Sequence, residues 1–358
     1  MRVGLVIYGS LETISGGYLY DRKLVEYLRR QGDQVEIISL PWRDYLRHLG
    51  DNFSPALLRR FRQMSLDILL QDELNHPSFF WINRRLKALF PLVGIVHHLR
   101  CSESRPAWQN RLYRLVEKRY LNSLDGFVCN SQTTRREVQA LAGAERPCTV
   151  AYPAGDRLSP AATPEEIAHR ADQPGPLRLL FLGNVIPRKG LHFLLQALSR
   201  LPLESWELAV VGSLEFEPKY ARLVLRQADQ LGLSTQITFH GALDEGDLVA
   251  QFRSNQLLVV PSSYEGFGIT YLEGMGFGLP SIASTGGAAG EIITHGVNGF
   301  LVQPGDVQML SERIRQLAED RALLARLSLA ARQRFLNHPT WEQTGQRIRE
   351  FLLNMLTR

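Results

Sequence analysis

Residues 259–280 read VVPSSYEGFGITYLEGMGFGLP and predict a strand, a glycine turn and a short helix, in that order. The apolar strand 257–260 is broken by Pro261, and the helix begins near Ile269 and ends before Pro280. Glycines in the turn let a ligand approach the backbone, and the first amides of the helix carry the positive end of its dipole. This pattern predicts a binding site for an anionic phosphate.

Two glutamates flank the predicted phosphate site. Glu265 lies in the turn and Glu273 follows eight residues later, which is about two helical turns. Both carboxylates can therefore face one cleft at different depths. Because carboxylates are poor phosphate ligands but good acceptors for sugar hydroxyls, the stretch predicts a nucleotide-sugar site. The alternative is an ordinary helix start with two solvated glutamates.

A second phosphate site is predicted earlier in the chain. The apolar strand 177–182 is followed by the loop GNVIPRKG, residues 183–190, and then by a helix. Lys189 in this loop can neutralise a leaving diphosphate without a metal ion. The alternative is a basic loop without a ligand.

These motifs resemble those of the retaining glycosyltransferases of family 4, which have the GT-B fold. The resemblance rests on the EGFG run that starts at Glu265, on Glu273 and on Gly-Leu-Pro at 278–280. It implies that Glu273 holds the ribose hydroxyls of the donor and that Glu265, with the backbone after it, holds the donor sugar. The predicted donor site also includes the turn and the helix start: Gly266, Phe267, Gly268, Ile269 and Thr270.

The basic loop matches the family pattern in part. Lys189 stands where the family has lysine, but Asn184 stands where it has arginine. Arg188 lies elsewhere in the loop, so the sequence leaves open whether it replaces the missing arginine. We include Arg188 among the expected donor-binding residues.

The first half of the chain alternates strands and helices, which predicts a parallel sheet. Family chains often carry Gly-Gly after the first strand, at the wall facing the donor phosphates, and Gly17 matches it; the alternative is an ordinary helix N-terminus. Strand 91–96 delivers His97 and His98 at its carboxyl end, where ligands of parallel sheets bind. The resemblance assigns the role near the donor sugar to His97, with His98 or a structural role as the alternative.

The composition suits a soluble globular protein. With 358 residues, of which 44% are hydrophobic and 22% charged, the chain is too long for one core and suits two domains. Its net charge of +5 suits an anionic substrate or an acidic membrane surface and does not imply nucleic acid. Three scattered cysteines, an N-terminus that reads as a strand and the lack of a long apolar run predict a cytoplasmic protein.

The fold class expected is α/β, a GT-B fold in which two Rossmann-like domains turn their parallel sheets toward a central cleft. We expect an N-terminal acceptor-binding domain, a linker, a C-terminal nucleotide-sugar-binding domain and a final helix that crosses back to the first domain. The expected boundaries are, in this order, 1–155, 156–176, 177–338 and 339–358.

The resemblance implies a hexosyltransferase-type enzyme that moves a sugar from a UDP- or GDP-sugar to a sugar or lipid-linked hydroxyl acceptor. The residues expected to be catalytic are His97, Lys189 and Glu265. No carboxylate is obviously placed as a covalent nucleophile, so we expect same-face attack with retention. No Asp-x-Asp metal site is found, so no metal and no cofactor are expected. A non-catalytic nucleotide-sugar binder and a sugar phosphorylase remain as alternatives.

Residues 42–65 combine eight large apolar residues with five arginines. One hypothesis is that this segment docks the protein on the inner face of a membrane, so that a lipid-linked acceptor can reach it. The alternative is that the apolar residues pack the first domain while the arginines stay solvated.

Overall fold

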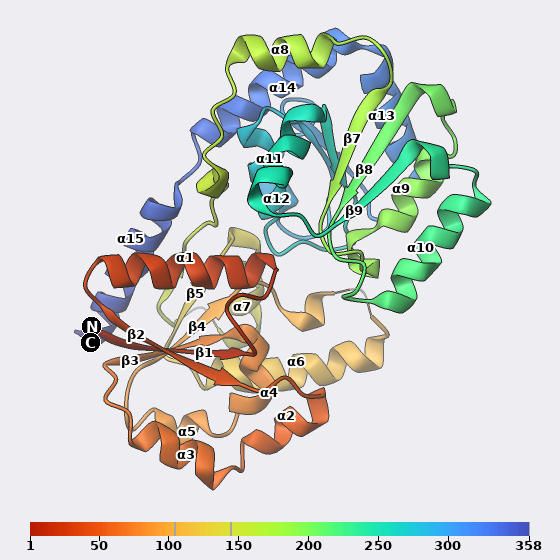
Figure 1. Ribbon diagram of the computed structural model, residues 1–358. Coiled ribbons are helices and arrows are strands. Elements are labelled where there is room, and N and C mark those ends of the chain that lie inside the picture. Colours follow the sequence, from red (N-terminus) through yellow and green to blue (C-terminus); the bar gives the residue numbers. More distant parts are fainter. Residues whose placement is uncertain (104, 144, 358) are drawn as a thin grey trace. The chain divides into compact units, whose positions relative to one another are not determined.

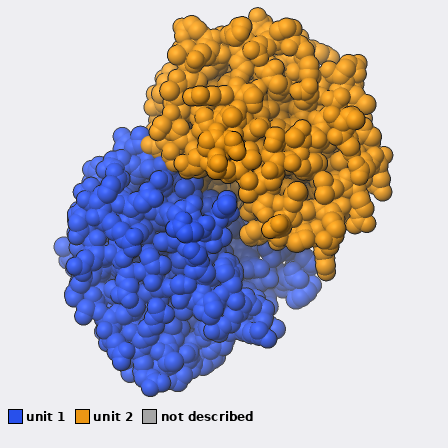
Figure 2. All heavy atoms as spheres, viewed as in Figure 1, with its two compact units in different colours: residues 1–153, 339–358 blue, residues 154–338 orange. Residues whose placement is uncertain are grey.

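The structure is a computed structural model that describes residues 1–103, 105–143 and 145–357. The chain divides into two compact units, which Figure 2 distinguishes by colour. Unit 1 comprises Met1–Pro153 and Pro339–Arg358, and unit 2 comprises Ala154–His338. Each unit is built on its own parallel sheet, which confirms the expected α/β class.

Unit 1 contains a six-stranded sheet in the order β2-β1-β3-β4-β5-β6, and all of its strand pairs are parallel. Strands β3 and β4 are buried along their whole length, as expected when helices cover both faces of a sheet. The strands are β1 (Arg2–Tyr8), β2 (Gln34–Leu40), β3 (Ile68–Asp72), β4 (Leu92–Val96), β5 (Gly126–Cys129) and β6 (Cys148–Val150). The helices are α1 (Gly16–Arg30), α2 (Tyr45–Asp51), α3 (Pro55–Arg62), α4 (His76–Phe79), α5 (Asn83–Leu86), α6 (Ala107–Asn122), α7 (Gln132–Ala142) and α15 (Trp341–Leu356).

The C-terminal helix α15 belongs to unit 1, where it packs beside α1 (Figure 1). A Cβ atom at Gly345 would lie 2.3 Å from the ring of Tyr27, so only glycine allows this approach. The Thr344 hydroxyl donates to the Tyr152 carbonyl at 2.6 Å. These contacts fix the helix to the first half of the chain.

One local expectation in unit 1 is wrong. The pattern of residues 79–89 predicts a single helix, but the structure has the two short helices α4 and α5 with a break between them. At the break the side-chain oxygen of Asn52 accepts a hydrogen bond from the Trp81 amide at 2.8 Å. That amide is thereby lost to the helical ladder, and Trp81 is left 43% exposed.

Unit 2 contains a second six-stranded parallel sheet in the order β12-β11-β10-β7-β8-β9. The strand order reverses between β7 and β10, and such a switch point is where ligands of open parallel sheets bind. The strands are β7 (Leu177–Leu182), β8 (Trp206–Val211), β9 (Ile237–Gly241), β10 (Leu257–Val260), β11 (Ser281–Ser284) and β12 (Gly299–Val302). The helices are α8 (Pro164–Asp172), α9 (Leu191–Leu198), α10 (Pro218–Gln230), α11 (Glu245–Ser254), α12 (Ile269–Gly276), α13 (Val307–Glu319) and α14 (Arg321–Leu336).

Residues 156–176, expected as a linker, are part of unit 2 and contain helix α8. The helix starts with a capping box between Thr163 and Glu166 and packs against α14. The Arg170 guanidinium donates to the Phe277 carbonyl at 2.6 Å. Across both units, none of the helices that the structure describes is both long enough and apolar enough to cross a bilayer.

Candidate functional site

The loops after β7 and β10 meet at the switch point of the unit 2 sheet. Gly190 ends the first loop with φ +73°, in the left-handed region that favours glycine. A Cβ atom there would lie 2.3 Å from the carbonyl oxygen of Pro261 in the second loop. The glycine therefore allows the closest approach of the two loops in which the sequence predicts phosphate sites.

Lys189 and Glu265 form an ion pair between these two loops. Lys189 Nζ donates to Glu265 Oε1 at 2.5 Å, and the Ser262 hydroxyl donates to the same oxygen at 2.6 Å. Arg188 Nη1 lies 3.6 Å from Glu265 Oε2 and donates to the Tyr264 carbonyl at 2.8 Å. Arg188, whose role the sequence left open, thus lies within reach of the same carboxylate as Lys189.

The ion pair keeps Glu265 ionised although it is buried. Burial alone would raise the pKa of Glu265, but the charges of Lys189 and Arg188 together with hydrogen bonds lower it to about 2. Burial lowers the pKa of Lys189 and outweighs the opposite effect of Glu265. A phosphate that enters this site would compete with Glu265 for both cations, and a displaced carboxylate could accept a hydroxyl.

The turn before α12 has the geometry that an anion site requires. Gly268 precedes the helix with φ +100°, and a Cβ atom there would lie 2.4 Å from the Tyr271 ring. The amides of Ile269 and Thr270 precede the bond from the Tyr271 amide to the Gly268 carbonyl, so they lie at the free N-terminal end of the helix. The hydroxyl oxygen of Thr270 is buried and has no hydrogen-bond partner among the described residues.

The rest of the predicted turn is only partly accessible. Gly266 is half-buried, and Phe267 is 3% exposed with its ring 5.8 Å from the His338 ring. Phe267 therefore shapes the turn by packing. Any contact of this residue with a ligand would come from its backbone.

Glu273 lies apart from the Lys189–Glu265 pair in a different ion pair. Its Oε1 accepts a hydrogen bond from Arg157 Nε, and Arg157 Nη1 also reaches Glu245 Oε1 at 2.8 Å. Glu273 is 2% exposed, and burial raises its pKa although Arg157 opposes the shift. Arg157 was not predicted; it lies just after Gly155, where a Cβ atom would lie 2.9 Å from the Glu273 amide nitrogen.

In unit 1 the structure brings Gly17 and His97 together. His97 follows β4, and a Cβ atom at Gly17 would lie 3.2 Å from His97 Cδ2. His97 Nε2 lies 3.4 Å from Asp21 Oδ1 and 3.9 Å from Asp72 Oδ2. His98 points elsewhere, with its Nε2 3.0 Å from Glu103 Oε1.

The Asp21–Asp72–His97 cluster is buried and incompletely hydrogen-bonded. Among the described residues, both oxygens of Asp21, Oδ2 of Asp72 and Nε2 of His97 have no hydrogen-bond partner. Burial raises the pKa of Asp21 to about 7, and burial together with the charge of Asp21 raises that of Asp72 to about 7. Burial lowers the pKa of His97 although Asp72 opposes the shift.

Two occupants could satisfy this cluster. A proton on one carboxyl group would give the other oxygens a donor, and the raised pKa values favour it. A metal ion could also bind, because one ligand atom from each of the three residues lies within 4.8 Å of the others. Glu73 adds a further carboxyl group beside the cluster, since its Oε2 accepts from the His97 amide at 3.0 Å.

The sequence analysis did not predict the acidic partners of His97. Asp72 and Glu73 directly follow the buried strand β3, in the same way that His97 follows β4. Asp21 lies three residues before the buried Leu24 on the inner face of α1, where an apolar residue is the usual choice. A charged residue on the buried face of a helix was the available signal.

The comparisons with known proteins cover both units. The family described as glycosyl transferases group 1 matches residues 163–334, and glycosyltransferase family 4 matches residues 20–157. The O-antigen chain mannosyltransferase C of Escherichia coli is 32% identical over 290 residues, which are 79% of this chain and 74% of that protein. Two glycogen synthases of Mycobacterium tuberculosis are 32% identical over 177 residues, but the match spans only 42% of their length.

Solved structures match the chain over its length. A sucrose-phosphate synthase from Thermosynechococcus elongatus has a TM-score of 0.85 at 20% identity and covers 99% of each chain. The Anabaena protein Alr3699/HepE, in complex with UDP-glucose, has a TM-score of 0.79 at 20% identity and covers 99% of this chain and all of that one. These structures confirm the GT-B fold. The chain belongs to the family 4 glycosyltransferases.

Proposed function

We propose that this protein is a retaining glycosyltransferase that moves a sugar from a UDP- or GDP-sugar to a hydroxyl acceptor. The observation that carries the proposal is the ion pair between Lys189 and Glu265, because it joins the two loops in which phosphate sites were predicted. The complex of HepE with UDP-glucose supports a nucleotide-sugar donor. The named relatives act on different sugars, so the transferred sugar is left to experiment.

Donor binding would exchange the partners of this ion pair. The diphosphate of the donor takes hydrogen bonds from Lys189, from Arg188 and from the amides at the start of α12. Glu265 loses its cation and accepts a hydroxyl of the donor sugar instead. The pair thus keeps a buried lysine and a buried carboxylate solvated by each other until the donor supplies a partner for each.

The same cations would stabilise the leaving group. Negative charge on the diphosphate grows as the glycosidic bond breaks, and fixed cations stabilise that charge most when it is largest. The acceptor hydroxyl attacks the face that the diphosphate leaves, so that the anomeric configuration is retained. In this scheme Lys189 and Arg188 supply the positive charge, and no metal ion or cofactor is required.

We assign His97 to the contact with the donor sugar and Asp21 and Asp72 to positioning its ring. Both carboxyl groups lie within 4 Å of His97 Nε2. A protonated carboxyl group would donate a hydrogen bond and set which ring nitrogen of His97 carries the proton. Glu273 keeps its proposed role with the ribose hydroxyls, with Arg157 holding the carboxylate in place.

A donor screen tests the proposed function. Melting curves are measured with UDP-, GDP- and ADP-sugars, and a donor at 100 times its Kd should add about 2.7 kcal/mol of apparent stability. The stabilising donor is then incubated with candidate acceptors, and release of the nucleoside diphosphate is measured. Stabilisation without turnover would favour a non-catalytic binder, and absorbance of a pyridoxal group in the purified protein would favour a phosphorylase.

We further propose that the protein acts in the cytoplasm, at the inner face of a membrane, on a lipid-linked acceptor. Within residues 42–65, Leu58 and Phe61 are buried and pack unit 1, whereas Trp42, Leu46 and Phe53 are 56%, 73% and 72% exposed. The structure thus divides the apolar residues of this segment between a packing role and an exposed surface. The arginines of α3 at positions 59, 60 and 62 are exposed beside them.

Sedimentation with vesicles tests this location. The wild-type protein should bind anionic vesicles in a salt-sensitive way and should not bind neutral ones, because each basic residue near an anionic bilayer contributes about 1 kcal/mol. Changing Arg59, Arg60 and Arg62 to Gln should weaken the binding. Absence of binding to either kind of vesicle at low salt would favour a soluble acceptor.

A further inference from the structure

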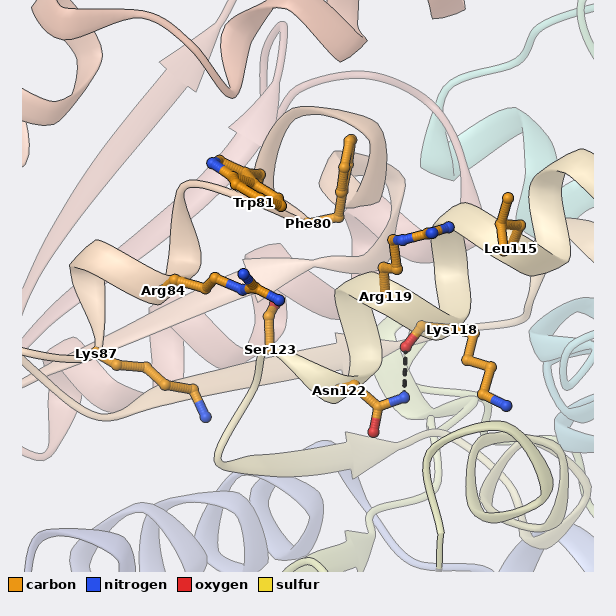
Figure 3. Close-up of a pocket in the computed structure, with 9 residues that line it drawn as sticks. All are labelled: Phe80, Trp81, Arg84, Lys87, Leu115, Lys118, Arg119, Asn122 and Ser123. Carbon is orange, nitrogen blue, oxygen red and sulfur yellow. Dashed lines mark hydrogen bonds between the residues drawn. The ribbon is translucent and has the colours of Figure 1, made fainter.

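Unit 1 has a cavity of about 510 Å³ on its surface, away from the residues discussed so far. Figure 3 shows that its lining side chains come from two stretches that face each other, residues 80–87 and residues 115–123. Four of them are cationic: Arg84, Lys87, Lys118 and Arg119. No carboxylate lines the cavity.

Three of these four cations lack an ion-pair partner. Lys87 is neutralised by Asp125, whose Oδ1 lies 2.8 Å from its Nζ. Among the described residues, no carboxylate is paired with Arg84, Lys118 or Arg119. Arg84 instead stacks on the Trp81 ring, with 4.6 Å between its guanidinium carbon and the ring centroid. Three like charges around one cavity repel each other unless an anion enters it.

The end of helix α6 does not account for these cations. Basic residues near a helix C-terminus commonly hydrogen-bond its last carbonyls. Here Arg146 donates to the carbonyls of Leu121 and Asn122, at 2.6 and 3.0 Å, and Lys87 donates to the Leu124 carbonyl at 3.4 Å. The carbonyls at this helix end therefore have cationic partners already, and the other three cations are left over.

The remaining wall of the cavity is apolar. Phe80 is half-buried, while Trp81 is 43% and Leu115 is 50% exposed. A cavity of about 510 Å³ is in the range of small-molecule sites and is larger than a phosphate ion requires. Its shape and lining suit a charged group joined to a ring or to an apolar chain.

The cavity also lies at the other edge of the sheet from His97. Lys87 precedes β4 and Ser123 precedes β5, so these lining residues lie at the amino ends of the two strands. His97 follows the carboxyl end of β4. A ligand in the cavity would therefore occupy a second site, separate from the predicted donor and acceptor residues.

We propose that this cavity binds the phosphate group of a phosphate ester whose organic part packs against Trp81 and Leu115. Two guanidinium groups can each donate two parallel hydrogen bonds to phosphate oxygens, and Lys118 adds a further positive charge. The phosphate can belong to a free metabolite or to a lipid headgroup, since both present the same oxygens. The proposal does not depend on the proposed glycosyltransferase activity.

The test measures binding of the same chemical group in two forms. Phenyl phosphate is titrated calorimetrically as the soluble ester, and vesicles of phosphatidylcholine with and without phosphatidic acid present the ester as a headgroup. The pocket variant is Arg84→Gln with Arg119→Gln. The control variant is Arg85→Gln with Arg111→Gln, which removes the same charge from exposed positions of the same two stretches that do not line the cavity.

The pocket variant should weaken binding by roughly tenfold or more, whereas the control should stay within about twofold. Loss of phenyl phosphate binding would identify a free ester as the ligand, and loss confined to vesicles with phosphatidic acid would identify a headgroup. Equal losses in the two variants would show a general charge effect and overturn the proposal. So would the absence of binding by the wild-type protein in both forms.

Two further measurements guard the interpretation. Circular dichroism melts show whether the pocket variant is folded, and the single variant Arg119→Gln replaces it if the double variant is not. Binding of phenyl phosphate is also measured with Lys189→Ala, because a phosphate can enter the predicted donor site of unit 2. Binding that is lost with Lys189→Ala and retained by the pocket variant would assign the phosphate to the donor site and overturn the proposal.

Discussion

The two groups of predicted site residues differ in how their charges are balanced. In unit 2, Lys189 and Arg188 face the carboxylate of Glu265, whose pKa is held at about 2. In unit 1, the imidazole of His97 faces two carboxyl groups, and burial raises the pKa of both to about 7. The first group consists of ions that satisfy each other, and the second retains polar atoms that need a proton or a ligand.

This difference separates two ways of preparing a site. A paired site is stable without ligand, and its ligand must compete with an internal partner. An unpaired buried cluster changes its protonation before anything binds, so its state depends on pH. We therefore expect substitutions in unit 2 to act mainly on catalysis and donor binding, and those in unit 1 to change the pH dependence as well.

The largest effect is expected for Lys189→Ala, which should lower kcat by about 100-fold or more and raise the donor KM less. The reason is that the charge on the leaving diphosphate grows in the transition state. Steady-state kinetics measure both constants, and Lys219→Ala, at an exposed lysine of α10, serves as the control. A kcat within about twofold of wild type would show that the basic loop is not the phosphate clamp.

Lys189→Ala also removes the main partner of a buried carboxylate. The double variant Lys189→Ala with Glu265→Gln separates the two consequences, because it removes both charges of the pair. Recovery of stability without recovery of kcat is expected. Recovery of kcat would mean that the single variant failed because of the unpaired Glu265 and not because the diphosphate lost its cation.

Glu273→Ala should weaken donor binding by about ten- to a hundredfold, since a charged acceptor for the ribose hydroxyls is lost. Glu245→Ala is the matched control, because Glu245 also pairs with Arg157 but has a 70% exposed side chain. Calorimetry with the donor compares the two variants. Similar affinities in both would show that Glu273 serves only to hold Arg157, and would remove the ribose assignment.

The sequence predicted the parts of the site that a local pattern encodes. The basic loop, the glycine turn and the two glutamates each follow a recognisable strand, and the structure places them at one sheet edge in unit 2. The pairing of these groups could not be predicted, because Lys189 and Glu265 are 76 residues apart and Arg157 and Glu273 are 116 apart. Such contacts depend on the packing of the whole unit.

The surroundings of His97 show the same limit. The strand pattern identified the histidine, but its partner Asp21 comes from a helix that reads as an ordinary amphipathic one. The pattern of residues 156–176 likewise indicated a linker because it is rich in Pro, Ala and charge, whereas α8 is stabilised by its capping box and by its packing on α14. Composition describes a segment alone and carries no record of what packs against it.

His97→Ala should reduce turnover, with a milder effect for His98→Ala. His97 is 7% exposed and lies against Gly17, whereas the side chain of His98 is 25% exposed and faces Glu103. General acid–base and positioning roles of histidine typically contribute at least about 100-fold, which a turnover assay resolves easily. The reverse ranking would show that the strand delivers the second histidine to the substrate.

The smallest effect is expected in the pH dependence of stability, tested with Asp21→Asn. The pKa of Asp21 rises from 3.8 to about 7 in the folded protein, so the native state binds more protons than the unfolded state in this interval. Stability should therefore be greatest below about pH 4 and fall as the pH rises toward 7. The variant keeps the shape of the side chain but cannot ionise, so it should lose part of this slope and exceed the wild type at pH 8 by roughly 1–3 kcal/mol. Urea unfolding at several pH values measures this, and the same series with added Mg²⁺ or Mn²⁺ tests the other occupant of the cluster. A rise in stability with metal in the wild type that is absent in Asp21→Asn would show that a cation, and not a proton, balances the carboxylates of unit 1. An unchanged slope without metal would show that Asp21 is already ionised when the protein folds.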